Sequence, residues 1–154
     1  MNPLKTIKLD FCVLNFYDTF VISEVNEGVN VSKEHIAKAH QTIVDFFGSN
    51  TYYGYISLRI NDYNVDPTDY LSCPFYDYIT GMAIVSDKAI KRETANFERA
   101  FFKKSLEVFY TVEEAVNWIT TLPTENLNKK ALEGGRKGGR GEGGKGLFLM
   151  SNYR

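Results

Sequence analysis

Cysteine and histidine are both scarce in this sequence, with two residues of each among 154. Two cysteines, Cys12 and Cys73, are too few for a disulfide framework, and their spacing matches no metal-binding motif. The histidines, His35 and His40, lie five residues apart and therefore do not share one helix face as a metal-binding pair would. We expect no metal site and no cofactor, and a reducing, cytoplasmic setting.

Long apolar runs are missing as well. The first ten residues contain no apolar core of about 7–15 residues, so we expect no signal peptide. No segment approaches the roughly 20 apolar residues of a membrane span. The sequence also lacks a nucleophile–base pair and a pair of carboxylates at a recognisable catalytic spacing. An enzyme is therefore the class of protein that the sequence favours least.

Positive charge is sparse outside the C-terminal region. Residues 1–122 hold 11 Lys and Arg against 16 Asp and Glu (net −5), whereas residues 123–154 hold 7 against 3 (net +4) and most of the glycines. Nucleic-acid binding needs clustered Lys and Arg, so only this tail could contact RNA, weakly and without sequence preference. We expect the tail to be disordered or to derive from cloning. Its segment 139–146 imitates a phosphate-binding loop but has Gly146 where a hydroxyl is required, which argues against nucleotide binding.

The sequence does contain a regular succession of strand and helix patterns. With 44% hydrophobic residues the chain can bury one core, and we expect a single domain over residues 1–122. Apolar residues alternate with others from Ile7 to Leu14 and again in residues 20–25, with a turn at Tyr17-Asp18. This pattern predicts a β-hairpin over residues 6–25.

The rest of the domain alternates apolar strands with capped helices. The strands are expected at residues 53–60, 79–86 and 106–110. The helices are expected to begin at Ser32, Asp66, Asp87 and Thr111. Together with the hairpin, this order predicts an α/β fold with a mixed sheet of about five strands and about four helices packed on it.

Two of the helices carry more detailed expectations. The first has Ser32 as its N-cap and ends at Gly48, where glycine can adopt the left-handed conformation of a helix end. In the helix that Asp87 caps, four residues recur at helical spacing and form its apolar side. They are Ile90, Thr94, Phe97 and Phe101.

We expect a site in the stretch from Tyr52 to Asp69. Its first half, residues 53–60, is rich in aromatic and β-branched residues, which is typical of an interior strand. Its second half is polar and leads into the helix start at Asp66-Pro67. Proteins of the α/β class commonly place binding residues where a strand ends in a polar loop ahead of a helix.

A family resemblance rests on this order of elements and on three strings, YISLRINDYNVDP, GMAIVSD and LEVFYTVEEAVNWI. The chain resembles the small bacterial SpoIIAA-like proteins of the STAS superfamily, whose fold is similar to that of CRAL-TRIO lipid-carrying domains. The resemblance covers roughly residues 5–122. It implies a compact domain that has no catalytic activity and works through contact with a protein or a small ligand.

The resemblance also implies a form of regulation. Anti-sigma-factor antagonists of this family are switched by phosphorylation of a Ser or Thr in an Asp-Ser-Ser-Gly-like motif after the central strand. The corresponding segment here, residues 60–68, lacks that motif, and Thr68 is the nearest hydroxyl. Thr68 is therefore the candidate phosphorylation site. CRAL-TRIO domains need further helices to cover a lipid cavity, and this chain is too short to supply them.

Arg59 is a charge inside an otherwise apolar strand. It could anchor an anion near the amides of the helix at Pro67, or it could pair with Asp62 or Asp69, or reach solvent. Pairing with a carboxylate or exposure to solvent is favoured over anion binding, because a charge is rarely buried without a partner.

The loop after this strand and the tyrosines around it are further candidates. The loop contains four side chains with oxygen atoms, Asn61, Asp62, Asn64 and Asp66, but it lacks the ligand spacing of a calcium site. The favoured interpretation of this oxygen-rich loop is that they are turn residues whose side chains bond their own backbone. Seven of the ten tyrosines fall between Tyr52 and Tyr78, and such a cluster suits either an interface or a mixture of core and surface. The candidate residues for ligand or partner binding are Arg59, Asn61, Tyr63, Asp66, Thr68, Tyr70, Tyr76 and Tyr78.

Three functions remain open on these grounds. The first is a regulatory domain that binds a protein partner or self-associates through a sheet edge or the tyrosine-rich face. The second is a carrier of a small amphipathic or lipid-like ligand, which requires an apolar cavity of several hundred Å³ beside residues 70–78. The third is an enzyme of unknown class.

Overall fold

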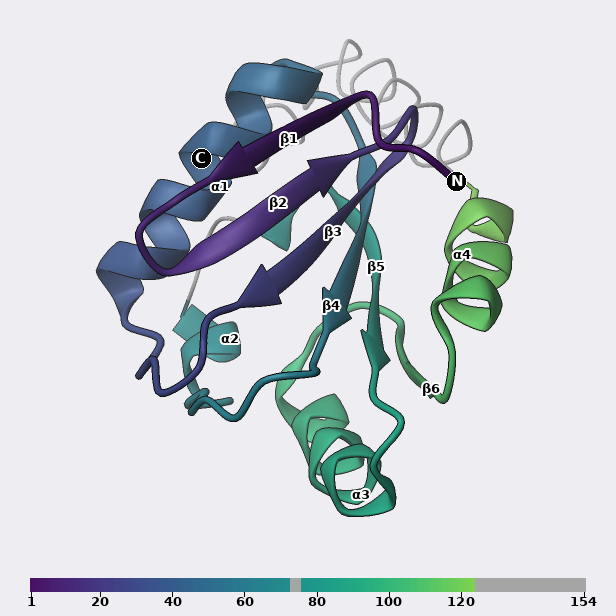
Figure 1. Cartoon of the computed structure of the whole chain (residues 1–154). Coiled ribbons are helices and arrows are strands. Elements are labelled where there is room, and N and C mark those ends of the chain that lie inside the picture. Colours follow the sequence, from purple (N-terminus) through teal and green to yellow (C-terminus); the bar gives the residue numbers. More distant parts are fainter. Residues whose placement is uncertain (73–75, 124–154) are drawn as a thin grey trace, which may run out of the picture.

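The computed structural model of the protein describes residues 1–72 and 76–123 (Figure 1). Cys73 and nearly all of the predicted tail lie outside the described residues. The strands are β1 (Lys5–Lys8), β2 (Cys12–Phe16), β3 (Phe20–Val25), β4 (Tyr53–Leu58), β5 (Ile79–Val85) and β6 (Leu106–Phe109). The helices are α1 (Lys33–Phe47), α2 (Asp69–Ser72), α3 (Ala89–Glu98) and α4 (Val112–Thr121), and a 3-10 turn, η2 (Arg99–Phe101), follows α3.

The strands form one mixed sheet in the order β1-β2-β3-β4-β5-β6. The first three strands pair antiparallel, and β3 to β6 pair parallel. The prediction of an α/β fold with a mixed sheet is confirmed, with six strands in place of about five.

The additional strand arises inside the predicted hairpin. The backbone N–H of Leu9 donates to the carbonyl of Cys12 (2.8 Å), and this turn divides the expected strand from Ile7 to Leu14 into β1 and β2. The prediction of one continuous strand is therefore wrong. Apolar residues continue at every second position through the turn, so the alternation contained no sign of it.

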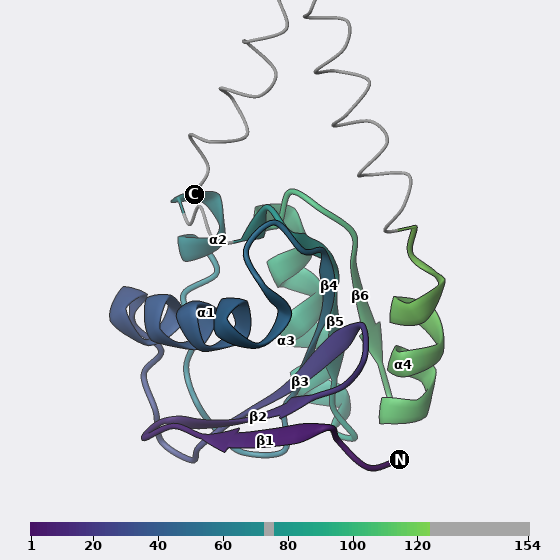
Figure 2. The same cartoon turned by 90° about the horizontal axis from the view of Figure 1, so that it is seen from above.

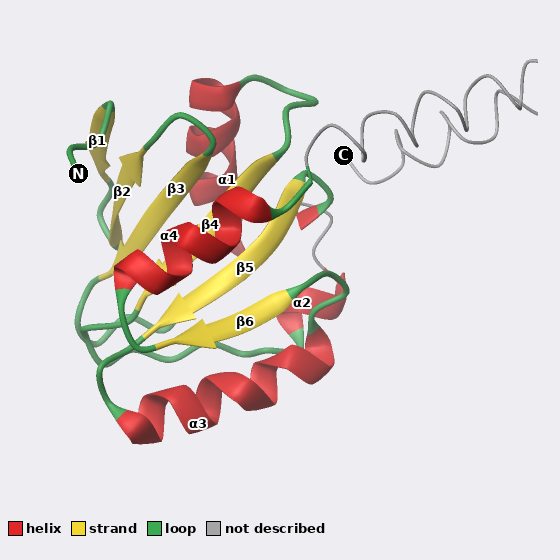
Figure 3. Ribbon diagram, turned by 90° about the vertical axis from the view of Figure 1, so that its right-hand side faces the viewer, coloured by secondary structure: helices red, strands yellow, loops and turns green. Residues whose placement is uncertain are grey.

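Each parallel strand lies next to its predecessor, and this fixes the side on which the helices pack. A right-handed crossover that always steps in the same direction brings every connecting helix to the same face. Accordingly α1, α2 and α3 cover one face of the sheet, whereas α4 follows the last strand and packs on the other (Figures 2 and 3). The core therefore has two parts, one on each side of the sheet.

The central strand β4 supplies a different kind of side chain to each face. Gly54 and Ile56 face α4, whereas Tyr53 and Tyr55 face α1. Tyr53 and Ile56 are buried, which confirms the predicted interior strand. The strand ends two residues earlier than predicted, because Ile60 is 51% exposed in the loop that follows.

The helix ends agree with the sequence at α1 and α4 but not at α3. Ser32 and Thr111 each cap a helix through their hydroxyl, and Gly48 ends α1 with a φ of 96°. The predicted Asp87 cap is wrong. The N-cap position of α3 is Lys88, whose N–H donates to the hydroxyl of Ser86 (3.2 Å).

Candidate functional site

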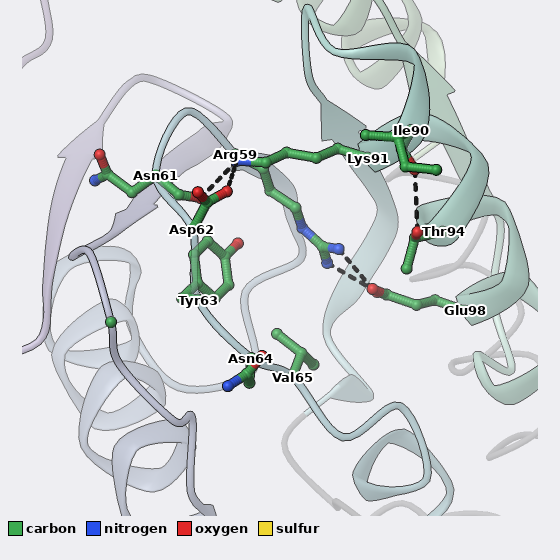
Figure 4. A pocket seen from close by; sticks show the side chains of 11 residues that line it. Arg59, Asn61, Asp62, Tyr63, Asn64, Val65, Ile90, Lys91, Thr94 and Glu98 are labelled. Atoms are coloured by element: carbon green, nitrogen blue, oxygen red, sulfur yellow. Dashed lines mark hydrogen bonds and ion pairs between the residues drawn. The ribbon is translucent and has the colours of Figure 1, made fainter.

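A groove of about 450 Å³ opens at the carboxyl ends of β3 and β4 (Figure 4). One wall is the polar segment after β4, residues 61–65, and the opposite wall is α3. Gly28, in the loop after β3, also borders it. The α3 wall consists of Ile90, Lys91, Thr94 and Glu98. The volume is in the range of small-ligand sites, and the groove is partly open to solvent.

The floor of the groove is an ion pair between Arg59 and Glu98. The two guanidinium nitrogens Nη1 and Nη2 lie 2.5 and 2.8 Å from Oε1 and Oε2, in a bidentate arrangement. Both side chains are nearly buried, at 11% and 7% exposure. Burial alone would lower the pKa of Arg59, but hydrogen bonding to Glu98 and its negative charge raise this pKa above its ordinary value. The expected pairing with Asp62 or Asp69 is wrong, although the expectation that Arg59 has a carboxylate partner is confirmed.

Further hydrogen bonds extend this ion pair into a network. The phenol of Tyr70 donates to Oε2 of Glu98 (2.9 Å), and burial together with this carboxylate raises the pKa of Tyr70, which keeps the phenol neutral. Nε of Arg59 donates to the hydroxyl of Ser57 (3.2 Å), which lies 3.3 Å from the hydroxyl of Tyr63. The network joins β4, its following loop, α2 and α3.

A second ion pair closes one side of the groove. Nζ of Lys91 lies 2.7 Å from Oδ1 of Asp62 and donates to the carbonyl of Asn61 (3.0 Å). The hydrogen bond from Lys91 holds the pKa of Asp62 below its ordinary value. The side-chain amide of Asn61 donates to the carbonyl of Val25 (2.9 Å), and the N–H of Asp62 donates to the carboxylate of Glu27 (2.8 Å). These bonds connect the loops after β3 and β4 to α3.

The side chains of the oxygen-rich loop bond both neighbouring segments and the loop itself. Asn64 donates to the side chain of Asn30 (2.7 Å), and the two residues form an isolated parallel bridge. Oδ1 of Asp66 accepts from the N–H and the hydroxyl of Thr68 (3.0 and 2.6 Å), and these bonds lower the pKa of Asp66. The favoured interpretation, turn residues that bond their own backbone, is confirmed at Asp66. It is wrong for the side chains of Asn61, Asp62 and Asn64, which bond residues of other segments. Among the residues that the structure describes, no three His, Cys, Asp or Glu side chains gather as metal ligands.

The candidate residues from the sequence do not form one surface. Arg59, Asn61 and Tyr63 line the groove. Tyr70 and Tyr76 pack edge-to-face with each other and with Phe102, at centroid distances of 5.6–5.7 Å. The residues outside both groups are Asp66, Thr68 and Tyr78. The hydroxyl of Tyr78 donates to Asn50 (3.0 Å), and phosphorylation of the exposed Thr68 would place a phosphate beside the Asp66 carboxylate.

Sequence reasoning missed the entire α3 wall. Of the residues expected to line one side of this helix, Ile90 and Phe97 are 68% and 67% exposed, whereas Phe101 packs against the core. The helix instead buries Ala95 and Glu98. The unpaired charge of Arg59 in the strand was the available signal that some acidic residue must turn inward, but nothing in the sequence identified Glu98 as that residue.

The chain matches no family model, no curated protein and no solved structure. Within the described residues, no helix has the length and apolar character needed to cross a membrane. The resemblance to SpoIIAA-like proteins thus stays a prediction.

Proposed function

We propose that the protein is a non-enzymatic interaction domain that holds a segment of a partner protein along α3. The observation that carries the proposal is the α3 ridge, defined as Ile90, Thr94 and Phe97. Ile90 and Thr94 form part of the groove wall, and Phe97 continues the same side of the helix one turn further. Large apolar side chains gathered beside a groove are typical of protein-interaction sites.

The groove itself supports binding rather than catalysis. Arg59 and Glu98 neutralise each other, and Lys91 and Asp62 do the same. In the described residues every buried polar side-chain atom has a hydrogen-bond partner. Both oxygens of the Glu98 carboxylate are already bound, by the Arg59 guanidinium and the Tyr70 phenol. The groove therefore offers shape and hydrogen-bonding edges for a ligand.

A partner segment fits the molecule better than self-association through a sheet edge. Strand β1 carries Lys5 and Lys8, and charged residues on an edge strand oppose pairing with another strand. At the other edge, the guanidinium of Arg99 donates to the carbonyl of Leu106 in β6 (3.0 Å) and occupies a group that a new strand would need. A regulatory role for such binding is what the resemblance to SpoIIAA-like proteins implies.

Selection of displayed random peptides tests the proposal. We expect peptides selected on the wild-type chain to lose at least tenfold in affinity for Ile90→Glu and for Phe97→Glu, measured by fluorescence anisotropy. Leu4→Glu is the matched control, because Leu4 is also 68% exposed but lies at the N-terminus. Circular dichroism verifies that each variant is folded. Peptides that bind all four proteins equally, or a failure to select any peptide, would contradict the proposal.

A further inference from the structure

Another cavity, of about 70 Å³, lies between α1 and the sheet. It is separate from the groove, with no lining residue in common. Helix α1 lies on one side of it, strands β2, β3 and β4 lie on the other, and Tyr76 borders it ahead of β5. The cavity is partly open to solvent. The residues used below are Ile36, Ala39, Ile43, Cys12, Tyr55 and Tyr76.

The cavity has a physical cause in the sizes of the side chains along α1. Near the C-terminal end of the helix, Phe47 stacks on Tyr53 with ring centroids 5.2 Å apart. Near the N-terminal end, His35 stacks on Phe11 at 4.4 Å. These two aromatic stacks hold the helix away from the sheet, and between them Ala39 offers only a methyl group. The space therefore follows from the sequence and is not filled by any side chain of α1.

Burial keeps three of the titratable groups around the cavity uncharged. Burial raises the pKa of the Cys12 thiol to about 11, so it stays protonated. Burial lowers the pKa of His40 and raises that of Tyr55, so both remain neutral. Most of the other lining residues are aliphatic or aromatic. An ion placed here would exchange water for mostly apolar walls, so the walls disfavour charged molecules.

The volume restricts the size of an occupant. An apolar cavity of about 150 Å³ binds benzene, so a cavity of 70 Å³ has room for about half as many carbon atoms. A lipid acyl chain requires several hundred Å³ and does not fit. Apolar cavities stay empty of water and accept small apolar molecules when the size matches.

We propose that this cavity binds a small uncharged apolar molecule of roughly three or four carbon atoms. The site is independent of the groove and of the partner segment proposed for it. It shares only Tyr76 with the segment 70–78, beside which the sequence placed a lipid-like cavity, and it is much smaller than that cavity was expected to be.

Methyl NMR of the full chain under xenon pressure, and with a series of linear alcohols from ethanol to hexanol, tests this site. We expect saturable shifts of the methyl signals of Ile36 and Ile43 with xenon. Among the alcohols we expect affinity to rise to propanol or butanol and then to fall at least fivefold at hexanol. Hexanol binding as tightly as propanol would overturn the size assignment.

A matched pair of substitutions on α1 provides the control. Ala39→Leu fills the cavity and is expected to weaken xenon binding at least tenfold. Ala37→Leu adds the same atoms to the same helix at a position that does not line the cavity, and is expected to leave binding unchanged. If Ala39→Leu does not fold, the smaller Ala39→Val replaces it. No saturable shift in the wild type, or equal xenon affinity in the filled variant, would overturn the proposal.

Discussion

The two faces of the sheet are packed in opposite ways. On the α4 face a cluster of apolar residues packs against the helix, and α4 lies so close that two glycines are needed beneath it. On the other face, α1 stands on aromatic side chains above a cavity, and α3 rests on a buried ion pair beside a groove. The comparison suggests that the α4 face secures the fold, while the α1–α3 face has the space and polar groups that binding requires.

The alternation of side chains along one strand explains much of this difference. From Tyr53 onward, odd-numbered residues of β4 and its extension face α1 and α3, and even-numbered residues face α4. The odd positions are Tyr53, Tyr55, Ser57 and Arg59, all with polar ends that need partners. The even positions are Gly54, Ile56 and Leu58, which need only close packing.

The largest expected effect comes from the buried ion pair on the α1–α3 face. Glu98→Ala leaves Arg59 buried without its partner, and we expect a loss of about 3–5 kcal/mol in the free energy of unfolding. Urea denaturation measures it. The matched control is Glu107→Ala, which breaks the surface pair with Arg99, whose side chains are 48% and 49% exposed. That loss should stay below about 1 kcal/mol.

Equal losses in the two ion-pair variants would contradict the distinction between a polar interior and a polar surface. The double variant Arg59→Met/Glu98→Met sharpens the test, because replacing both partners removes the isolated charge. We expect it to be more stable than Glu98→Ala.

The close packing of α4 against the sheet is disturbed most directly by a substitution at Gly54. A Cβ added there would lie 2.3 Å from Cγ1 of Ile119, which is too close for any real contact. We expect Gly54→Ala to lower the free energy of unfolding by as much as about 3 kcal/mol through overpacking. Gly81→Ala should cost less, because its nearest neighbour is the flexible end of Leu122. Thermal and urea unfolding give the values.

A double-mutant cycle identifies the cause of the Gly54 effect. In the background Ile119→Ala the space above Gly54 is open, so Gly54→Ala should there cost much less than in the wild type. An equal cost in both backgrounds would mean that backbone effects, and not the contact with α4, determine the result.

A smaller effect is expected from Tyr70→Phe, which removes one donor from the Glu98 carboxylate but leaves the ion pair intact. Hydrogen bonds to charged groups contribute about 1.5–3 kcal/mol, and the remaining contact with Arg59 places this case at the lower end. The control is Tyr78→Phe, whose hydroxyl bonds the neutral side chain of Asn50. If Tyr70→Phe lowers the free energy of unfolding no more than Tyr78→Phe does, the bond from Tyr70 to Glu98 has no special contribution to stability.

The sequence predicted the elements of the fold better than it predicted the site. Local signals were sufficient where they act over a few residues, as with the Ser32 and Thr111 caps, Gly48 and the interior strand β4. They failed at the turn that begins at residue 9, because apolar residues continue at every second position through it and the sequence there looks like one strand. They also failed at Asp87, where the hydroxyl of Ser86 satisfies the backbone at the helix start instead.

The site depends on a contact between residues 39 positions apart, and that is why the sequence could not supply it. The apolar residues of α3 have ordinary helical spacing, which predicts that they face the core. Burial of Glu98 against Arg59 requires a different orientation of the helix, in which Ile90 and Phe97 are exposed to solvent. One long-range ion pair therefore overrides the local pattern and creates the ridge that we propose as a binding surface.

The smallest expected effect concerns the ion pair at the rim of the groove. Because Lys91 lowers the pKa of folded Asp62, this pair stabilises the fold fully above the pKa of Asp62 in the unfolded chain, and its contribution disappears as the pH falls through the lower folded value. Asp62→Asn should therefore reduce the urea midpoint slightly at pH 7 and not at all in strong acid. Raising the salt concentration should also reduce the difference, because Asp62 is exposed. The control is Asp18→Asn, in the exposed turn between β2 and β3. If the difference in urea midpoint between wild type and Asp62→Asn persists unchanged in acid, the pair with Lys91 is not its source.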